Sequence, residues 1–126
     1  DLPDCSDLPT FESLPRELYL GVMDAADVMV GNSSSGIIEA PSFDLPVVDI
    51  GPREERRQRA DNTVSVPHET SAIEEAIRTC LMDEKIRQQA ESSSNPYDYG
   101  CAGQRIADTL ATVKLDESLL RKNITY

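Results

Sequence analysis

Residues 27–41 constrain the fold of this chain more than any other stretch of its sequence. The apolar run Val28–Val30 leads through Gly31 into the polar loop Asn32–Ser35, and an apolar stretch with one acid follows at 36–41. This order predicts a strand, a tight turn and the start of a helix. In α/β proteins such a turn presents unpaired backbone N–H groups and the positive end of a helix dipole, which together favour a phosphate group.

The serine loop, defined here as residues 32–36, has two interpretations. Ser33, Ser34 and Ser35 can add hydroxyl donors to a phosphate site, and Gly36 lets a ligand approach the backbone closely. Alternatively, one serine is an ordinary N-cap and the others fill a surface loop, because serine is common at that position. The stretch by itself leaves both interpretations open.

The segments around the serine loop predict an α/β fold with a Rossmann-like parallel sheet flanked by helices. We expect strands at 28–30, 47–50 and 63–66, and helices beginning at Leu14–Pro15 with Ser13 as the cap, near 36–41, and at 71–82, 83–92 and 102–113. Strand, helix and strand with short links form a βαβ pattern, and a parallel sheet needs helices on both faces.

Apolar stripes on two of these helices are expected to provide part of that cover. They are Leu14, Leu18, Val22 and Ala26 in the first helix, and Ala102, Ile106, Leu110 and Val113 in the last. The tail 115–126 predicts the start of a further helix. Because three strands make a small sheet for this class, we expect one partial domain, residues 1–126. An exposed sheet edge would then leave it marginally stable or prone to form a homo-oligomer.

Composition excludes several classes of partner. The chain has 23 Asp and Glu against 12 Lys and Arg, and the net charge of -11 argues against nucleic acid and anionic membranes. No apolar run reaches bilayer length, and no signal peptide is recognisable. Cys5, Cys80 and Cys101 are too scattered for a zinc site or a disulfide framework. We therefore expect reduced thiols, no metal and no cofactor in a cytoplasmic protein, and, since the chain lacks an initiator Met, a piece of a longer one.

A cluster of arginines follows the second expected strand. Its members are Arg53, Arg56, Arg57 and Arg59. Ligands of open parallel sheets bind at the carboxyl ends of strands, and arginine suits phosphate, so Arg53 is a candidate that faces the serine loop. Arg56 and Arg59 are expected to be solvated and paired with Glu54 and Glu55.

Glu39 and His68 are the other residues with recognisable chemistry. Glu39 can accept two hydrogen bonds from the cis-diol of a ribose, or it can be an acid that stabilises the helix dipole on an exposed face. His68 has no cysteine or acid pair at ligand spacing, so we expect a surface loop residue and no metal site. No Ser-His-Asp set can be assembled.

Several stretches of the chain resemble UDP-N-acetylglucosamine 2-epimerases, particularly the hydrolysing branch. They are Ser13–Leu20, Gly31–Phe43, Arg59–Asn62, Asn95–Tyr97 and Leu119–Lys122. Gly31–Phe43 is the specific part, whereas the helical stretches are not. The resemblance runs over most of the chain and implies the C-terminal nucleotide-binding part of a two-lobed enzyme. It implies the glycosyltransferase-B arrangement of two Rossmann-like lobes, with the N-terminal lobe missing here.

The resemblance also implies roles for individual residues. Ser33 and Ser34 would contact the diphosphate of a UDP-sugar, with Ser35 and Gly36 completing the loop, and Glu39 would hold the ribose hydroxyls. Arg53 would lie against the UDP. The family pattern after the second strand is usually Arg-Gln-x-Gly-Arg, whereas this chain has Glu54 in place of the Gln and Arg56 in place of the Gly. This departure places the role of Arg57 in more doubt than that of Arg53, because a carboxylate near phosphate is unfavourable unless it is paired.

The activity implied by the resemblance is removal of the proton at C2 of the sugar with expulsion of UDP. Water then adds with inverted stereochemistry to give N-acetylmannosamine. The proton-transfer residues of that family would lie upstream, so no catalytic residue is expected in this chain. Two other functions remain open from the sequence: the donor-binding lobe of a glycosyltransferase, and a non-catalytic module that senses nucleotide sugars.

Overall fold

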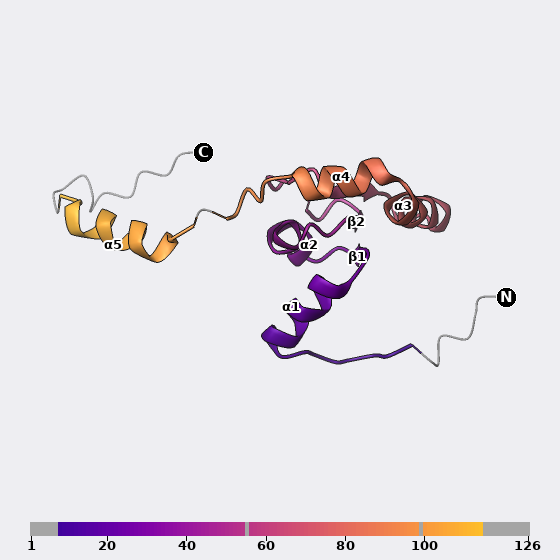
Figure 1. Ribbon diagram of the computed structural model, residues 1–126, viewed down its shortest axis with the longest axis horizontal. Helices are drawn as coiled ribbons and strands as arrows, with labels where there is room; N and C mark the ends of the chain where they lie inside the picture. Colours follow the sequence, from indigo (N-terminus) through magenta and orange to yellow (C-terminus); the bar gives the residue numbers. More distant parts are fainter. Residues whose placement is uncertain (1–7, 55, 99, 115–126) are drawn as a thin grey trace.

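The fold is built on a parallel sheet of three strands in the order β1 (Met29–Gly31), β2 (Val47–Ile50) and β3 (Thr63–Val66) (Figure 1). The structure is a computed structural model and describes residues 8–54, 56–98 and 100–114. Val47 of β2 pairs with Met29 on one side and with Thr63 on the other. The strands expected at 47–50 and 63–66 are confirmed, and the strand expected at 28–30 is displaced by one residue.

Helices cover both faces of this sheet. In the described part of the chain the helices near the sheet are α1 (Arg16–Ala25), α2 (Ser35–Ile38), the 3-10 helix η2 (Ala40–Phe43), α3 (Thr70–Met82) and α4 (Glu84–Ser92), and α5 (Ala102–Thr112) lies apart from it. Figure 1 shows α3 and α4 on one side of the strands, and α1 and α2 on the other. The expected α/β architecture with helices on both faces is therefore confirmed.

The core consists of two apolar layers that meet at β2. Successive strand residues point to opposite faces, so Val47 packs toward Met23 of α1 and Ala40 of η2. Val48 packs toward Ala76 and Cys80 of α3. β2 is buried along nearly its whole length, as a central strand covered on both faces should be.

The first helix differs from the expectation in its start and in its buried face. Pro15, with extended backbone, occupies the N-cap position and makes no side-chain cap, so Ser13 does not cap the helix. The stripe expected to be buried is wrong, because Leu18, Val22 and Ala26 are exposed. The buried side is instead formed by Tyr19, Leu20 and Met23, which pack against the cluster containing η2. Apolar residues lie on two sides of this short helix, and contacts distant in sequence select one of them.

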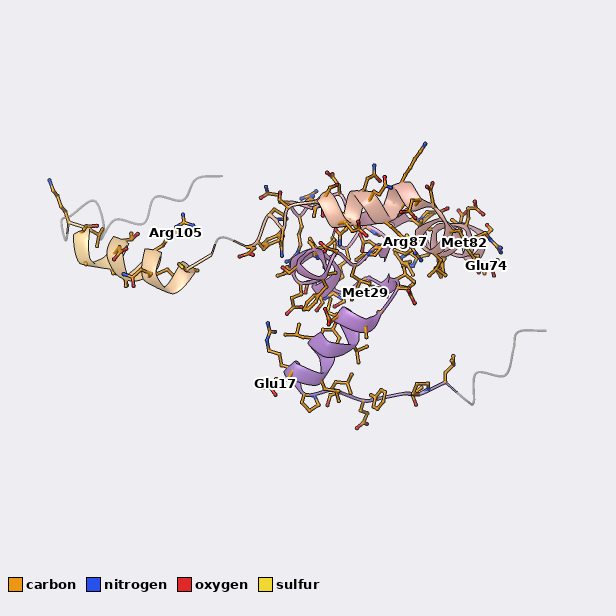
Figure 2. All side chains as sticks on the ribbon, viewed as in Figure 1. Glu17, Met29, Glu74, Met82, Arg87 and Arg105 are labelled. Carbon is orange, nitrogen blue, oxygen red and sulfur yellow. The ribbon has the colours of Figure 1, made fainter. Side chains whose placement is uncertain are left out.

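The last helix, α5, does not cover the sheet. None of its residues is buried, and Ile106 and Leu110 of the expected stripe are largely exposed. Figure 2 shows its side chains, including Arg105, apart from the rest of the described chain. The expectation that this helix supplies cover is therefore wrong. The tail 115–126, which carries the resemblance at Leu119–Lys122, lies outside the described residues, as does Cys5.

The helical stretch after the serine loop is divided at Glu39. α2 ends at Ile38, and η2 then continues in the tighter 3-10 form to Phe43. Pro41 explains the division because it has no N–H to donate to the carbonyl of Ile37, four residues earlier.

Gly36 allows α2 to pack closely on the sheet. It is buried, and a Cβ built on its backbone would lie 2.8 Å from Cγ1 of Val47 and 3.8 Å from Sδ of Met29. The absent side chain therefore faces β2. This gives Gly36 a packing role, beside the approach of a ligand that the sequence suggested.

Replacing Gly36 with alanine is expected to lower the free energy of unfolding by about 1–2 kcal/mol, because a well-packed valine would have to move. Urea unfolding followed by circular dichroism measures the change. Gly21→Ala is the matched control, since Gly21 lies in α1 and a Cβ there meets nothing within 4 Å. That control should stabilise the chain by roughly 0.5–1 kcal/mol through helix propensity. Equal effects of the two replacements would contradict the packing role.

Candidate functional site

The carboxyl ends of the three strands lie at one edge of the sheet because the strands are parallel. The serine loop follows β1, the arginine loop, defined here as residues 53–59, follows β2, and 67–69 follow β3. An open groove of about 650 Å³ lies at this edge, lined by Gly51, Pro52, Arg59, Ser65, Val66, Pro67 and His68. The structure therefore places the predicted arginines and the serine loop at the edge where α/β proteins bind ligands.

Within the serine loop, Ser33 and Ser34 have different local roles. The Ser33 hydroxyl accepts a hydrogen bond from the Ser35 N–H at 3.3 Å, and its carbonyl accepts one from the Gly36 N–H at 3.1 Å. Ser34 occupies the N-cap position of α2 without a side-chain cap. No hydrogen bond of its hydroxyl is found among the described residues. Ser33 thus stabilises the turn of the loop through local hydrogen bonds, while the Ser34 hydroxyl is available to donate and accept hydrogen bonds with a ligand.

Glu39 closes α2 and forms an ion pair with Arg16 of α1, with Oε1 and Nη1 2.9 Å apart. Glu39 is also the N-cap residue of η2, where a carboxylate suits the helix dipole, so both alternatives for Glu39 stay predictions. The pair borders a pocket of about 280 Å³, which Ser42 and Asn95 also line. Glu39 therefore lines a pocket of mixed polar and apolar character, with the Arg16 cation beside it.

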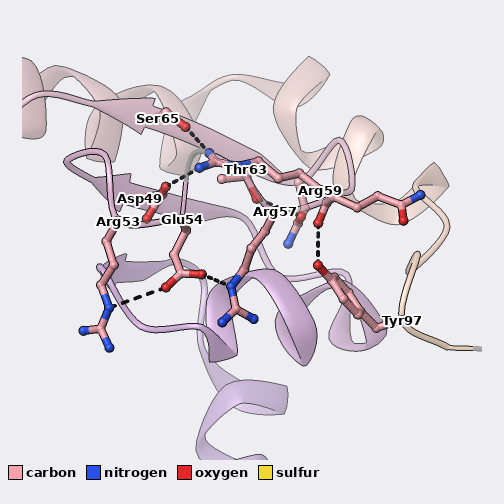
Figure 3. Close-up of polar contacts among 10 residues, drawn as sticks. Asp49, Arg53, Glu54, Arg57, Arg59, Thr63, Ser65 and Tyr97 are labelled. Atoms are coloured by element: carbon pink, nitrogen blue, oxygen red, sulfur yellow. Dashed lines mark hydrogen bonds and ion pairs between the residues drawn. The ribbon is translucent and has the colours of Figure 1, made fainter. Parts of the chain in front are cut away.

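The segment after α4 returns to this pocket and joins it to the arginine loop. The Asn95 side-chain amide donates to the Ile38 carbonyl at 3.0 Å and to the Ser42 hydroxyl at 2.6 Å. The Tyr97 hydroxyl donates to the Gln58 carbonyl at 3.0 Å (Figure 3). Asn95 and Tyr97 therefore hold this segment against α2, η2 and the arginine loop. The sequence singled out Asn95–Tyr97 through its resemblance to the family.

The arginine loop is organised around Glu54. This carboxylate is buried, with Oε1 3.6 Å from Nε of Arg53 and Oε2 2.5 Å from Nε of Arg57 (Figure 3). Arg56 is exposed in the same loop. A carboxylate near a phosphate group is unfavourable unless it is paired with a cation. Glu54 meets this condition because it forms ion pairs with two arginines.

Arg59 forms an ion pair with Asp49, and the expectation that it is a solvated residue paired with Glu54 or Glu55 is wrong. Its Nη2 lies 3.0 Å from Oδ2 of Asp49, whose side chain is 2% exposed. It also donates a hydrogen bond to the Ser65 hydroxyl. Register places Asp49 beside Ser65 on the neighbouring strand, so one arginine bridges β2 and β3. The signal that could have identified Asp49 is an acid inside the apolar strand 47–50.

His68 lies exposed at the rim of the groove next to Gly51. Gly51 has a φ of 81°, and a Cβ there would lie 2.3 Å from Nε2 of His68, so the close approach requires glycine. Within the described residues, no group of three histidine, cysteine or acidic side chains is arranged to hold a metal. Burial raises the pKa of the Cys80 thiol, which leaves it unreactive as a nucleophile at neutral pH.

Comparison with known proteins identifies the family. The sequence model of the family described as UDP-N-acetylglucosamine 2-epimerase matches residues 2–111. The chain belongs to the UDP-N-acetylglucosamine 2-epimerase family. This confirms the resemblance inferred from the motifs. In the described part of the chain, no helix has the length and apolar character needed to cross a membrane.

Relatives in this family are similar over most of the chain. The UDP-N,N'-diacetylbacillosamine 2-epimerase (hydrolyzing) of Legionella pneumophila is 37% identical over 98% of this chain and 31% of its own length. The GDP/UDP-N,N'-diacetylbacillosamine 2-epimerase (hydrolyzing) of Campylobacter jejuni is 37% identical over 90% and 29%. The UDP-N-acetylglucosamine 2-epimerase of Neisseria meningitidis is 32% identical over 79% and 26%. The chain thus spans less than a third of the length of each of these relatives.

Proposed function

We propose that this chain is the UDP-binding part of a hydrolysing UDP-N-acetylglucosamine 2-epimerase. In this proposal residues 1–126 belong to the C-terminal lobe of a two-lobed enzyme of the glycosyltransferase-B type. The observation that carries it is the convergence, at one edge of a parallel sheet, of the serine loop and the arginine loop in a member of this family. UDP is common to the names of the three relatives, which is why the proposal centres on UDP.

In the proposed reaction the chain stabilises the leaving group. When the bond between the sugar and UDP breaks, negative charge develops on the diphosphate. The hydroxyls of the serine loop and the guanidinium group of Arg53 would offset that charge, and fixed donors lose little energy to reorganisation. The chain is assigned no proton transfer at C2, so it should not catalyse the reaction without the rest of the enzyme.

Glu39 would hold the ribose in this proposal. Its carboxylate can accept hydrogen bonds from both hydroxyls of a cis-diol, as acids do in dinucleotide folds. Arg16 contacts Glu39 in the described structure, but the Arg16 side chain is largely exposed. Exposed ion pairs are weak, so the ribose hydroxyls can replace Arg16 at little cost.

Calorimetric titration with UDP tests this proposal. Ser34→Ala and Glu39→Ala are each expected to weaken UDP binding by roughly tenfold, because each removes one polar contact with the ligand. Ser94→Ala and Glu74→Ala are matched controls, since Ser94 is exposed near the end of α4 and Glu74 is exposed on α3 (Figure 2). UDP binding that all four replacements leave unchanged would refute the assigned site.

Product analysis on the full-length protein distinguishes the epimerase from the other functions that the sequence left open. Free N-acetylmannosamine released without an acceptor excludes a glycosyltransferase, and any turnover excludes a pure sensor. The family match favours the epimerase over both.

A further inference from the structure

The strongest unassigned feature of the chain is the buried carboxylate of Glu54. Its side chain is 3% exposed, whereas those of Arg53 and Arg57 are 69% and 46% exposed. A carboxylate is costly to bury unless cations pair with it. Here each Oε atom has its own arginine neighbour. The arginine clamp, defined as Arg53, Glu54 and Arg57, therefore consists of a buried anion that holds two outward-reaching cations.

Both arginines contact Glu54 through Nε, which leaves their terminal nitrogens available. In Figure 3 the terminal nitrogens of both side chains point away from Glu54, toward the same side of the loop. Within the residues that the structure describes, no acceptor pairs with these nitrogens. The terminal nitrogens of arginine form a planar fork that matches the oxygens of a phosphoryl group. The clamp thus presents two such forks, with one positive charge in excess.

We propose that Glu54 is a positioning residue that holds Arg53 and Arg57 as a two-armed receptor for the two phosphoryl groups of a nucleoside diphosphate. The inference rests on the proposed function, because it assigns the second arm of the UDP site to Arg57. The sequence departure at Glu54, which placed the role of Arg57 in doubt, becomes the reason that Arg57 takes part.

The chemistry of the two side chains explains why a carboxylate suits this task. A carboxylate shares its negative charge between two equivalent oxygens, so it can hold one arginine at each of them. Both contacts of Glu54 are ion pairs: Oε1 lies 3.6 Å from Nε of Arg53, and Oε2 lies beside Nε of Arg57 without an aligned hydrogen bond. The amide of glutamine has one acceptor oxygen, and its NH₂ group would face the second Nε–H, donor against donor. With Glu54 both arms are held by ion pairs, and with glutamine, which is uncharged, at least one arm is released.

A second explanation of Glu54 is that it only neutralises charge in the loop. That explanation predicts a change in anion affinity opposite to the change that positioning predicts, so affinity measurements separate the two. If Glu54 only neutralised the loop, its removal would raise the affinity for every anion. If it positions both arms, its removal lowers specifically the preference for an anion with two phosphoryl groups. The ratio of pyrophosphate affinity to orthophosphate affinity therefore reports positioning independently of total charge.

The test is calorimetric titration of the 126-residue chain with pyrophosphate, orthophosphate and UDP. The unsubstituted chain should bind pyrophosphate roughly tenfold more tightly than orthophosphate, because the second fork adds charged hydrogen bonds. In Glu54→Gln and in Arg57→Gln the preference should fall to near parity. Arg56→Gln is the matched control: it removes one charge from an exposed position of the same loop, so it should weaken both anions equally and keep the preference.

Each result decides between the possibilities. Equal strengthening of both anions by Glu54→Gln would overturn the inference, as would UDP binding that depends on Ser34 and Glu39 but not on Arg57. UDP binding that does not depend on Arg57 would leave the proposed function standing.

Loss of the preference for pyrophosphate in both Glu54→Gln and Arg57→Gln, in a chain that binds no UDP, would support the two-armed receptor and refute the proposed function. If Glu54→Gln unfolds by circular dichroism, Arg57→Lys decides, because it keeps the charge at an exposed position and removes the fork; a retained preference would overturn the inference.

Discussion

Replacing Asp49 with asparagine is expected to lower the free energy of unfolding by about 3 kcal/mol, the low end of the range for breaking a buried ion pair. Asp49 is 2% exposed, and its Oδ2 lies 3.0 Å from Nη2 of Arg59. The replacement preserves the size of the side chain but leaves the Arg59 cation, which is 21% exposed, without its anion. Urea unfolding at constant pH measures the loss.

A second replacement, at Arg59, tests whether the loss of stability comes from the broken ion pair. Arg59→Met in the background of Asp49→Asn should recover part of the lost stability, because replacing both members of a buried pair is much less costly than removing one. Arg56→Gln is the control for a charge change alone and should alter the free energy of unfolding by less than about 0.5 kcal/mol. An effect of Asp49→Asn as small as that of the control would show that the bridge between β2 and β3 contributes no stability.

The strands were predictable from sequence because their signals are local. β2 and β3 are short apolar or β-branched runs whose ends are marked by Pro46, by Gly51–Pro52 and by Pro67. Each of these residues acts on its own neighbourhood, and no distant contact is needed to place the ends. The parallel pairing of β1 with β2 followed from the helical stretch between them, since a βαβ unit makes its strands parallel.

The buried face of α1 and the partner of Arg59 were not predictable in the same way. Leu18 and Met23 are both apolar, and which of them is buried depends on the position of η2, many residues later. Arg59 has Glu54 and Glu55 nearer in sequence, but the sheet register brings Asp49 beside Ser65 and places both within its reach. Charges near Arg59 in sequence therefore indicated the wrong partner, because the sheet brings a different acid within its reach.

The candidate site likewise has residues that local sequence signals predicted and residues whose arrangement depends on tertiary contacts. Sequence placed Ser34 and Arg53 directly after strands, where the structure also has them, whereas Glu39, expected one turn into a single helix, lies between α2 and η2. The clamp around Glu54 depends on the burial of that one side chain, and composition alone does not reveal burial in a loop rich in charge. Binding of UDP by these residues stays a prediction that the titrations will decide.

Replacing Asn62 with alanine is expected to lower the free energy of unfolding by about 2–3 kcal/mol. Asn62 is fully buried, and its side-chain amide donates to the Leu45 carbonyl at 2.8 Å, while its Oδ1 accepts from the Thr63 hydroxyl at 3.1 Å. Its own carbonyl accepts from the Val47 N–H. One side chain thus joins the residues that precede β2 and β3. Alanine would leave a cavity and an unpaired carbonyl, and urea unfolding measures the cost.

Asn62→Asp turns the same site into a pH-dependent one and separates the hydrogen bond from the packing. Burial disfavours the charged carboxylate, so the pKa of the introduced acid is raised in the folded state, which then binds more protons than the unfolded state. Stability of this variant should fall as pH rises from about 4 to about 7, because only the protonated acid can donate to the Leu45 carbonyl. Asn32→Asp, at an exposed asparagine of the serine loop, should show no such additional loss. Parallel pH curves for the two variants would mean that the amide of Asn62 fills space without holding the strands in register.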